Sequence, residues 1–251
     1  MPGGRDPYVV TIKTNPKISR RLICFAHAGG GASYFRPWAA TLPDWIELCA
    51  IQLPGRETRY CEPLLTSFDA VLEPVAQSLM RLTDIPTALF GHSFGGLLAF
   101  AAAQGLSAQG RTPQLVAVSA VRAPHLPAIR SLAALPDAAL LAAICDLGGV
   151  SGEALQYPQL LQLALPILRA DFNCVESYRR PQAHETISAS LWACGGDCDQ
   201  GVDVKSLSAW SAHAGADFKM RLFSGGHFYI AEHGPTLLTE IVNALKAQES
   251  S

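Results

Sequence analysis

Residues 90–100 read FGHSFGGLLAF, and this stretch decides what kind of fold the chain can form. The short apolar run TALF leads into it, and the helix-forming run LLAFAAAQGL continues from it. Ser93 stands between the two runs, with Gly91 two residues before it and Gly95 two residues after it. A strand, a tight turn that carries serine and a following helix form the nucleophile elbow, in which both flanking positions must be small. The stretch therefore predicts a raised, reactive serine at the end of a strand.

Strand-like and helix-like segments alternate along the rest of the chain. The strand candidates are 21–27, 46–54, 87–93, 115–121, 187–195 and 218–225, and the helix candidates are 33–42, 68–83, 94–109 and 235–247. This alternation predicts βαβ units and a mostly parallel sheet flanked by helices. Pro235 suits the first turn of the last helix.

Residues 124–182 interrupt this alternation with two leucine-rich stretches of helical period, LPDAALLAAICDLGG and YPQLLQLALPILRADFNCVESYRR. Apolar helices inserted between two core strands predict a lid over one edge of the sheet, although some of the leucines would serve plain packing. We therefore expect one α/β domain over residues 1–251, with a helical lid insertion at approximately 124–182.

Composition excludes several classes of protein. Of the 251 residues 49% are hydrophobic and 16% are charged, and the formal net charge is −2. This balance supports a large core, and without a Lys/Arg-rich run it argues against a nucleic-acid partner. The first 21 residues contain no apolar signal-peptide core, and no window approaches 18 apolar residues, so neither secretion nor a membrane is predicted.

The seven cysteines are an odd number in a chain long enough to fold without disulfides. Cys194 and Cys198 lie in CGGDC with no matching pair elsewhere, which argues against a zinc site. We expect a reduced, soluble, cytoplasmic protein.

A serine nucleophile needs a base, which in the α/β-hydrolase fold follows the serine and an acid along the chain. His227 lies in FSGGHFYI, just past the last strand candidate, in a loop with two glycines, and is the predicted base. Four other histidines follow Ser93: His125, His184, His213 and His233. The first two fall in or beside the predicted lid, His213 precedes the last strand, and His233 starts the last helix.

The acid has three candidates after the strand 187–195, in the loop GDCDQGVD. Asp199 is favoured, because Val202 three residues later can anchor the loop in the core while the carboxylate faces inward. Asp197 lies nearer the strand end and is the alternative, and Asp203 lies beyond the anchor. The strand 115–121 is followed by no carboxylate until Asp137.

An oxyanion hole needs two backbone donors, one of them the amide of the residue after the nucleophile, here Phe94. The second donor should follow an early strand, and FAHAGGGASYF at 25–35 fits, because its three glycines let backbone approach a ligand closely. Ala28 is the candidate. A phosphate-binding role for the glycines is not supported, since neither GxGxxG nor GxxxxGK is present.

Taken together, these segments resemble the type II thioesterases that accompany polyketide and nonribosomal peptide synthetases, a family of the α/β-hydrolase superfamily. The resemblance covers nearly the whole chain. It rests on FAHAGGGASYFRPWAATLP, IQLPGRETRY, LFGHSFGGLLAF, LPILRADFNCVESYRR, GGDCD and FSGGHFYI. The family pattern places the catalytic triad on Ser93, Asp199 and His227, with Ala28 and Phe94 as oxyanion donors.

The resemblance implies hydrolysis of acyl thioesters on the phosphopantetheine arm of carrier protein domains, which removes stalled acyl groups. It implies no metal and no cofactor beyond the arm that the substrate carries, and we expect a monomer. Two alternatives remain open. One is a carboxylic-ester hydrolase of lipase type with the same triad, and the other is a scaffold that binds carrier domains without turnover.

Overall fold

The computed structural model describes residues 6–82, 84–127, 131–149, 158–179, 181 and 185–247. Its centre is one seven-stranded sheet in the order β1-β3-β2-β4-β5-β6-β7. The strands are β1 (Val9–Lys13), β2 (Arg20–Phe25), β3 (Ile46–Ile51), β4 (Thr87–His92), β5 (Leu115–Ser119), β6 (Ser190–Gly196) and β7 (Phe218–Phe223). Only β1 pairs in the antiparallel direction, so the predicted mostly parallel sheet is confirmed.

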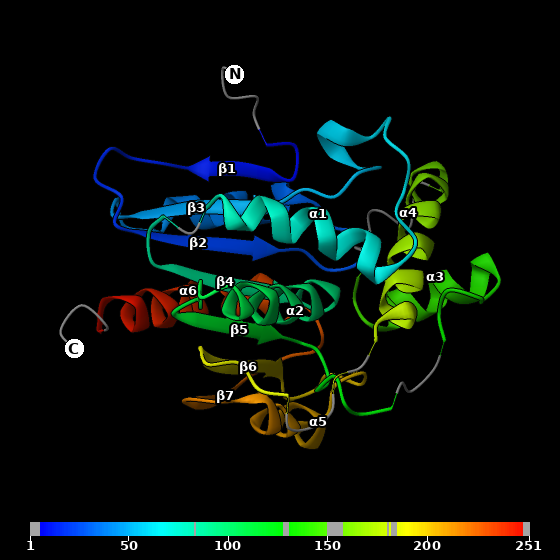
Figure 1. Ribbon diagram of the computed structural model, residues 1–251. Coiled ribbons are helices and arrows are strands. Elements are labelled where there is room, and N and C mark those ends of the chain that lie inside the picture. The colour runs from blue at the N-terminus through cyan, green and yellow to red at the C-terminus, as the bar shows by residue number, and fades with distance from the viewer. Residues whose placement is uncertain are drawn as a thin grey trace.

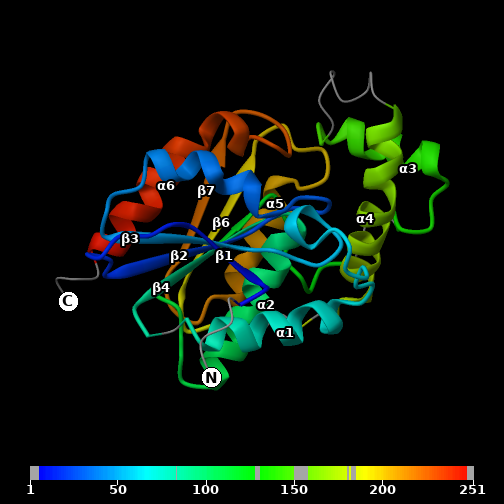
Figure 2. The ribbon, with the colours of Figure 1, turned by 90° about the horizontal axis from the view of Figure 1, so that it is seen from above.

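Helices cover both faces of the sheet (Figures 1 and 2). On one face lie α1 (Phe68–Met80), α2 (Phe94–Ala108), α5 (Val204–Ser208) and the 3-10 helix η4 (Ala209–His213). On the other lie the 3-10 helix η1 (Ala32–Ala40) and α6 (Ile230–Ala247), and a short 3-10 helix η2 (Glu57–Arg59) follows β3. Each face buries its own apolar cluster, with Phe100 and Trp210 in the first and Phe35 and Leu237 in the second. Two buried faces explain why the central strands read as continuous apolar runs.

Several elements differ from the sequence prediction, and the short helices η2, α5 and η4 were not predicted. Strand β1 was not predicted, and the segment predicted as a helix over 33–42 is a 3-10 helix. The last helix begins at Ile230, so the placement of Pro235 in its first turn is wrong. The backbone N–H of His233 already donates to Tyr229, so the helix has started before the proline, which removes only one donor from the helix.

The segment between β5 and β6 carries α3 (Asp137–Asp146) and α4 (Pro158–Ser177), which lie beyond the carboxyl ends of the parallel strands (Figures 1 and 2). Leu140, Ile144, Leu165 and Leu168 bury one another in a small apolar cluster there. The two helices thus lie where a lid was predicted. Whether they open and close as a lid stays a prediction. Among the described residues no helix is long and apolar enough to cross a membrane.

Candidate active site

Ser93 occupies the predicted elbow between β4 and α2. Its backbone is strained, with φ 54° and ψ −119°, and its N–H donates to the carbonyl of Ser119 on the neighbouring strand at 2.7 Å. The flanking glycines are needed, because a Cβ on Gly91 would lie 2.0 Å from the Gly95 carbonyl oxygen. A Cβ on Gly95 would lie 2.2 Å from the carbonyl oxygen of Phe25. The hydroxyl is therefore presented at the carboxyl edge of the sheet.

His227 lies between Ser93 and Asp199. Its Nε2 is 3.0 Å from the Ser93 Oγ, and its Nδ1 is 2.8 Å from Asp199 Oδ2. The imidazole and the carboxylate are both buried, while the serine is half-buried. The structure thus brings together the three predicted side chains, which come from the ends of β4, β6 and β7.

The three acid candidates have different surroundings. The second oxygen of Asp199 accepts from the backbone N–H of Gly201 at 2.8 Å and of Val202 at 3.2 Å, and Val202 is buried in the core. Asp197 is exposed and accepts from the N–H of Gly225, a bond that lowers the pKa of its carboxyl. Asp203 caps α5 by accepting from the Ser206 N–H. Only Asp199 contacts His227.

Three of the other histidines after Ser93 lie in the described residues and have other partners. His125 Nδ1 and His213 Nε2 are 2.8 Å apart and bond to each other. The ring of His233 packs on Phe223, with 5.6 Å between the ring centres. His184 lies outside the described residues.

Two further histidines, His27 and His92, lie near His227. Burial, with a smaller contribution from the nearby His227, lowers the pKa of His27 to about 4 and the pKa of His92 well below the ordinary value. His92 Nδ1 lies 2.9 Å from the Ser119 hydroxyl, which bonds in turn to the Tyr229 hydroxyl at 2.7 Å. Both rings are therefore neutral near pH 7, and they add no positive charge beside the base.

The candidate oxyanion donors stand at the same edge. Phe94 is the first residue of α2, so its N–H has no intrahelical acceptor and the positive end of the helix faces the serine. Ala28 and Ser93 line one cavity together. Two donors beside a serine can stabilise an oxyanion, and each such donor is typically worth about 10²–10³ in rate.

This cavity has a volume of about 410 Å³. Besides the residues at the sheet edge, it is lined by the α3 residues Leu141 and Ile144, by Leu147, Gly149 and Phe228, and by the α4 residues Leu161, Ala164, Leu168 and Phe172. A second cavity of about 470 Å³ adjoins it at Leu147 but is not lined by the serine or the base. The serine therefore opens into an apolar chamber, which suits a hydrocarbon chain. Nowhere in the described ranges do three His, Cys, Asp or Glu side chains group as metal ligands would.

Sequence reasoning assigned no role to a second set of buried polar side chains beside the site. Arg56 and Asp171 form a buried ion pair there, and the buried Gln52 accepts from the backbone N–H of Ala32, the first residue of η1. The exposed Glu57 accepts from the N–H of Ser33, the next residue. They lie in the segments LPGRETR and LRADF or beside them, which were noted only as marks of the resemblance. Charged residues inside otherwise apolar stretches are the signal that could have found them.

A serine elbow on a mostly parallel sheet, with a histidine and a carboxylate on later strand ends, defines the α/β-hydrolase fold. Comparisons with known proteins narrow this class. A family model described as the thioesterase domain matches residues 20–248. The thioesterase PikA5 of Streptomyces venezuelae is 36% identical over 233 residues, which cover 92% of this chain and 82% of that protein.

The probable cadicidin biosynthesis thioesterase of Streptomyces griseus is 33% identical over 90% of this chain, and the match spans 62% of that protein's length. Among solved structures, the type II thioesterase BorB from the borrelidin biosynthetic cluster superposes with a TM-score of 0.88. It is 32% identical, and the match covers 97% of this chain and 99% of BorB. The chain belongs to the thioesterase family, among the type II thioesterases.

Proposed function

We propose that the chain hydrolyses acyl thioesters on the phosphopantetheine arm of carrier protein domains, as an editing enzyme of a polyketide or nonribosomal peptide synthetase. The observation that carries the proposal is His227, which bridges Ser93 and Asp199 where the serine opens into an apolar cavity. Membership of the thioesterase family supports the substrate class.

The proposed reaction begins when His227 Nε2 takes the proton of the Ser93 hydroxyl and the Ser93 Oγ attacks the thioester carbonyl carbon. The carbonyl oxygen becomes an oxyanion, which accepts hydrogen bonds from the amides of Ala28 and Phe94. The intermediate collapses as the carbon–sulfur bond breaks, and the protonated His227 gives its proton to the departing thiolate. The arm then leaves as a free thiol, and the acyl group stays on the serine.

Hydrolysis of this acyl-serine repeats the steps with water. His227 takes a proton from the water molecule, the hydroxide attacks the ester carbonyl, and the serine regains its proton as the acid departs. Asp199 keeps the proton of the neutral imidazole on Nδ1 and stabilises the positive charge when the ring is protonated. The proposed steps use only groups of this chain and water, with no metal and no cofactor. We also propose that the enzyme is cytoplasmic and monomeric.

Intact mass spectrometry of a panel of acyl-loaded carrier domains, before and after treatment with the protein, tests reaction, partner and chain preference together. The expected result is loss of the acyl mass and recovery of the free arm, and Ser93→Ala is expected to show neither. Turnover by Ser93→Ala at the wild-type rate would refute the proposed nucleophile.

The same measurements separate the two alternatives. An ester hydrolase would cleave p-nitrophenyl esters faster than acyl-pantetheine thioesters of equal chain length. A scaffold without turnover would not be labelled by a fluorophosphonate, which reacts with activated serines.

A further inference from the structure

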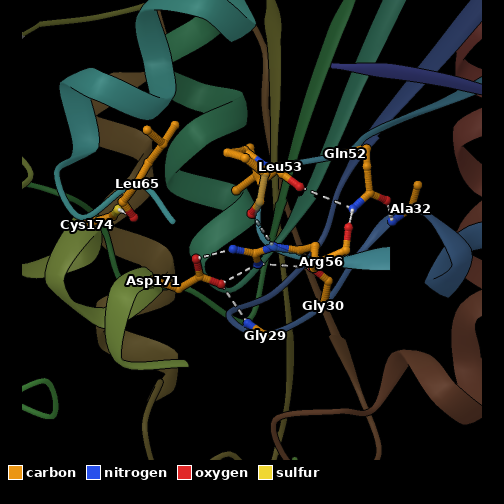
Figure 3. Close-up of polar contacts among 10 residues, drawn as sticks. Gly29, Gly30, Ala32, Gln52, Leu53, Arg56, Leu65, Asp171 and Cys174 are labelled. Atoms are coloured by element: carbon orange, nitrogen blue, oxygen red, sulfur yellow. Dashed lines mark hydrogen bonds and ion pairs between the residues drawn. The ribbon is translucent and has the colours of Figure 1, made fainter. Parts of the chain in front are cut away.

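Three segments far apart in the chain meet at one place: the glycine loop after β2, the turn after β3 and helix α4 (Figure 3). Asp171 on α4 forms a two-pronged ion pair with Arg56, with its Oδ2 2.6 Å from Nη1 and its Oδ1 2.8 Å from Nη2. The Asp171 Oδ2 also accepts from the backbone N–H of Gly29 at 2.7 Å. Asp171 is 1% exposed and Arg56 is 5% exposed. A pair this buried and this fully bonded holds a fixed geometry.

The Gly29 bond acts on the proposed oxyanion donor. The N–H of Gly29 belongs to the peptide that directly follows Ala28, so its bond to Asp171 fixes the orientation of that peptide. Arg56 Nη1 donates to the Gly30 carbonyl, two peptides further along, at 3.3 Å. The Gly30 N–H donates at 2.9 Å to the His27 carbonyl, which belongs to the same peptide as the Ala28 N–H. The backbone on the C-terminal side of Ala28 is therefore held by side-chain partners and one turn hydrogen bond, and not by strand pairing.

Helix α4 also limits this loop sterically. Gly29 has φ +80°, and a Cβ there would lie 2.8 Å from the Leu168 Cδ2. Leu168 lies three residues before Asp171, so both side chains share one face of α4. Leu168 and Phe172 line the acyl cavity. One helical turn thus carries both the cavity wall and the carboxylate that holds the loop.

The charges explain why an ion pair occupies this place. A lone carboxylate buried beside an oxyanion hole would repel the negative charge that forms during the reaction. Arg56 cancels that charge while leaving Asp171 Oδ2 as a strong acceptor for Gly29. The pair therefore supplies a strong hydrogen bond to the loop without a net negative charge.

We propose that Asp171, neutralised by Arg56, is a positioning residue that places the Ala28 donor, so that α4 must be seated on the cavity for the oxyanion hole to form. The inference rests on the proposed function, because it takes Ala28 as a donor. It adds a condition on the acyl chain, since a chain that displaces α4 also displaces the donor.

The test uses the full-length protein with Asp171→Asn, which keeps the volume and one acceptor but loses the charge. The kcat on an acyl carrier substrate is expected to fall roughly 10- to 100-fold with KM within about twofold, because misplacing a group by 1 Å can cost about 10² in rate. The rate of fluorophosphonate labelling is expected to fall in parallel, since the phosphonyl oxygen occupies the oxyanion hole.

Glu47→Gln is the matched control. Glu47 pairs with Arg21 at 2.5 Å in another buried ion pair, but at the amino ends of β2 and β3, away from the cavity. It is expected to lower the melting temperature while leaving kcat and the labelling rate unchanged.

A fall in melting temperature with unchanged kcat and labelling in Asp171→Asn would overturn the inference and leave the proposed function standing. A wild-type protein that is not labelled at all would instead refute the proposed function. If Asp171→Asn does not fold, Arg56→Lys serves in its place, because it keeps the charge and loses the two-pronged geometry. A lower kcat in Arg56→Lys supports the inference, and a wild-type kcat overturns it.

Discussion

Ser93 and His227 face helix α4 across the cavity, and the two sides of that cavity are attached to the molecule in different ways. The serine side is held by backbone pairing, since the residue before Ser93 pairs with Ser119 on β5, and Ser119 pairs with Cys194 on β6. The helix side is held by side chains, which include Asp171 bound to Arg56 and Glu176 bound to backbone N–H groups at 132 and 133.

Under the proposed function, this difference separates the reacting groups from the residues that would select the acyl chain. Backbone ladders tolerate many side chains, so the reactive groups keep their spacing when the sequence changes. Side-chain attachments depend on particular residues, so the apolar wall can change shape by substitution. Asp171 joins the two sides, because it lies on α4, the helix that forms the wall, and bonds the loop on the serine side.

The largest expected effect comes from a substitution on the serine side of the cavity. Asp199→Asn should lower kcat by about 10⁴, as loss of the carboxylate leaves the imidazole in the wrong tautomer. Steady-state hydrolysis of one acyl carrier substrate measures it. Asp197→Asn, two residues away and exposed, should leave kcat within about twofold of wild type, because Asp197 bonds the Gly225 N–H and not His227 and a surface substitution changes stability by only about 0.5 kcal/mol. Equal losses in both variants would count against the assignment of the acid.

A smaller effect is expected when the wall is opened. Leu168→Ala should reduce the free energy of unfolding by about 2–3 kcal/mol, the lower part of the range for buried leucine. It should also shift turnover toward longer acyl chains, because the cavity grows. Leu163→Ala on the same helix is the control, since Leu163 is 55% exposed and Leu168 is 8% exposed. Urea unfolding and a chain-length series provide the measurements; an unchanged series would contradict the role of Leu168 as a wall.

A pH titration tests the buried imidazoles on the serine side. In the folded protein the pKa values of His27 and His92 lie below the value of about 6.5 expected in the unfolded chain. Between these values the unfolded state binds more protons, so stability is full above pH 6.5 and is lost as the pH falls toward 4. In that window each histidine should lower the free energy of unfolding by up to about 1.4 kcal/mol for each unit by which the pH falls.

Urea unfolding at pH 7, 6 and 5 measures this loss, and His27→Gln should make the dependence shallower. The range above pH 5 isolates the imidazoles, because carboxyls with a lowered pKa such as Glu240 stay charged there. Stability that rises as the pH falls from 7 to 5 would be inconsistent with neutral buried rings.

The smallest effect concerns an exposed attachment of the helix side. Arg169 on α4 pairs with Asp137 on α3 at 2.6 Å, and the Asp137 side chain is 67% exposed. Asp137→Asn should cost less than about 1 kcal/mol, because solvent screens the pair and Arg169 keeps its bond to the Leu135 carbonyl. Thermal unfolding measures the change. If Asp137→Asn lowered the melting temperature as much as Asp171→Asn does in the same measurement, burial would not distinguish the two attachments.

Much of the fold and of the site could be predicted from the sequence because the signals are local. The strand β4, the glycines around Ser93 and the helix after them lie within about 20 residues, and each central strand is an apolar run. Among the residues of the loop, Val202 was the reason to prefer Asp199 over Asp197, and the family pattern agreed. The buried Val202 explains why the carboxylate that turns inward is Asp199.

The other features of the fold and the site depend on contacts between residues far apart in the chain, which a local sequence pattern does not show. Strand β1 is half-buried and pairs at the edge of the sheet, so its five residues give a weak pattern. Arg56 and Asp171 are 115 residues apart, and nothing local marks them as partners. The segments HAGGG, LPGRETR and LRADF were distinctive as a set, and the structure shows that they meet at one point.

The adjacency of β2 and β4 has a consequence for the two proposed donors. Phe25 pairs with Gly91 across these strands, and Ala28 and Phe94 each lie three residues beyond that pair. The two segments that carry the donors therefore start from paired residues one interstrand spacing apart, about 4.8 Å, a dimension common to all sheets. Sheet pairing thus brings the two donor segments side by side before any acyl group arrives, and the final alignment of the donors is left to the surrounding side chains, Asp171 among them.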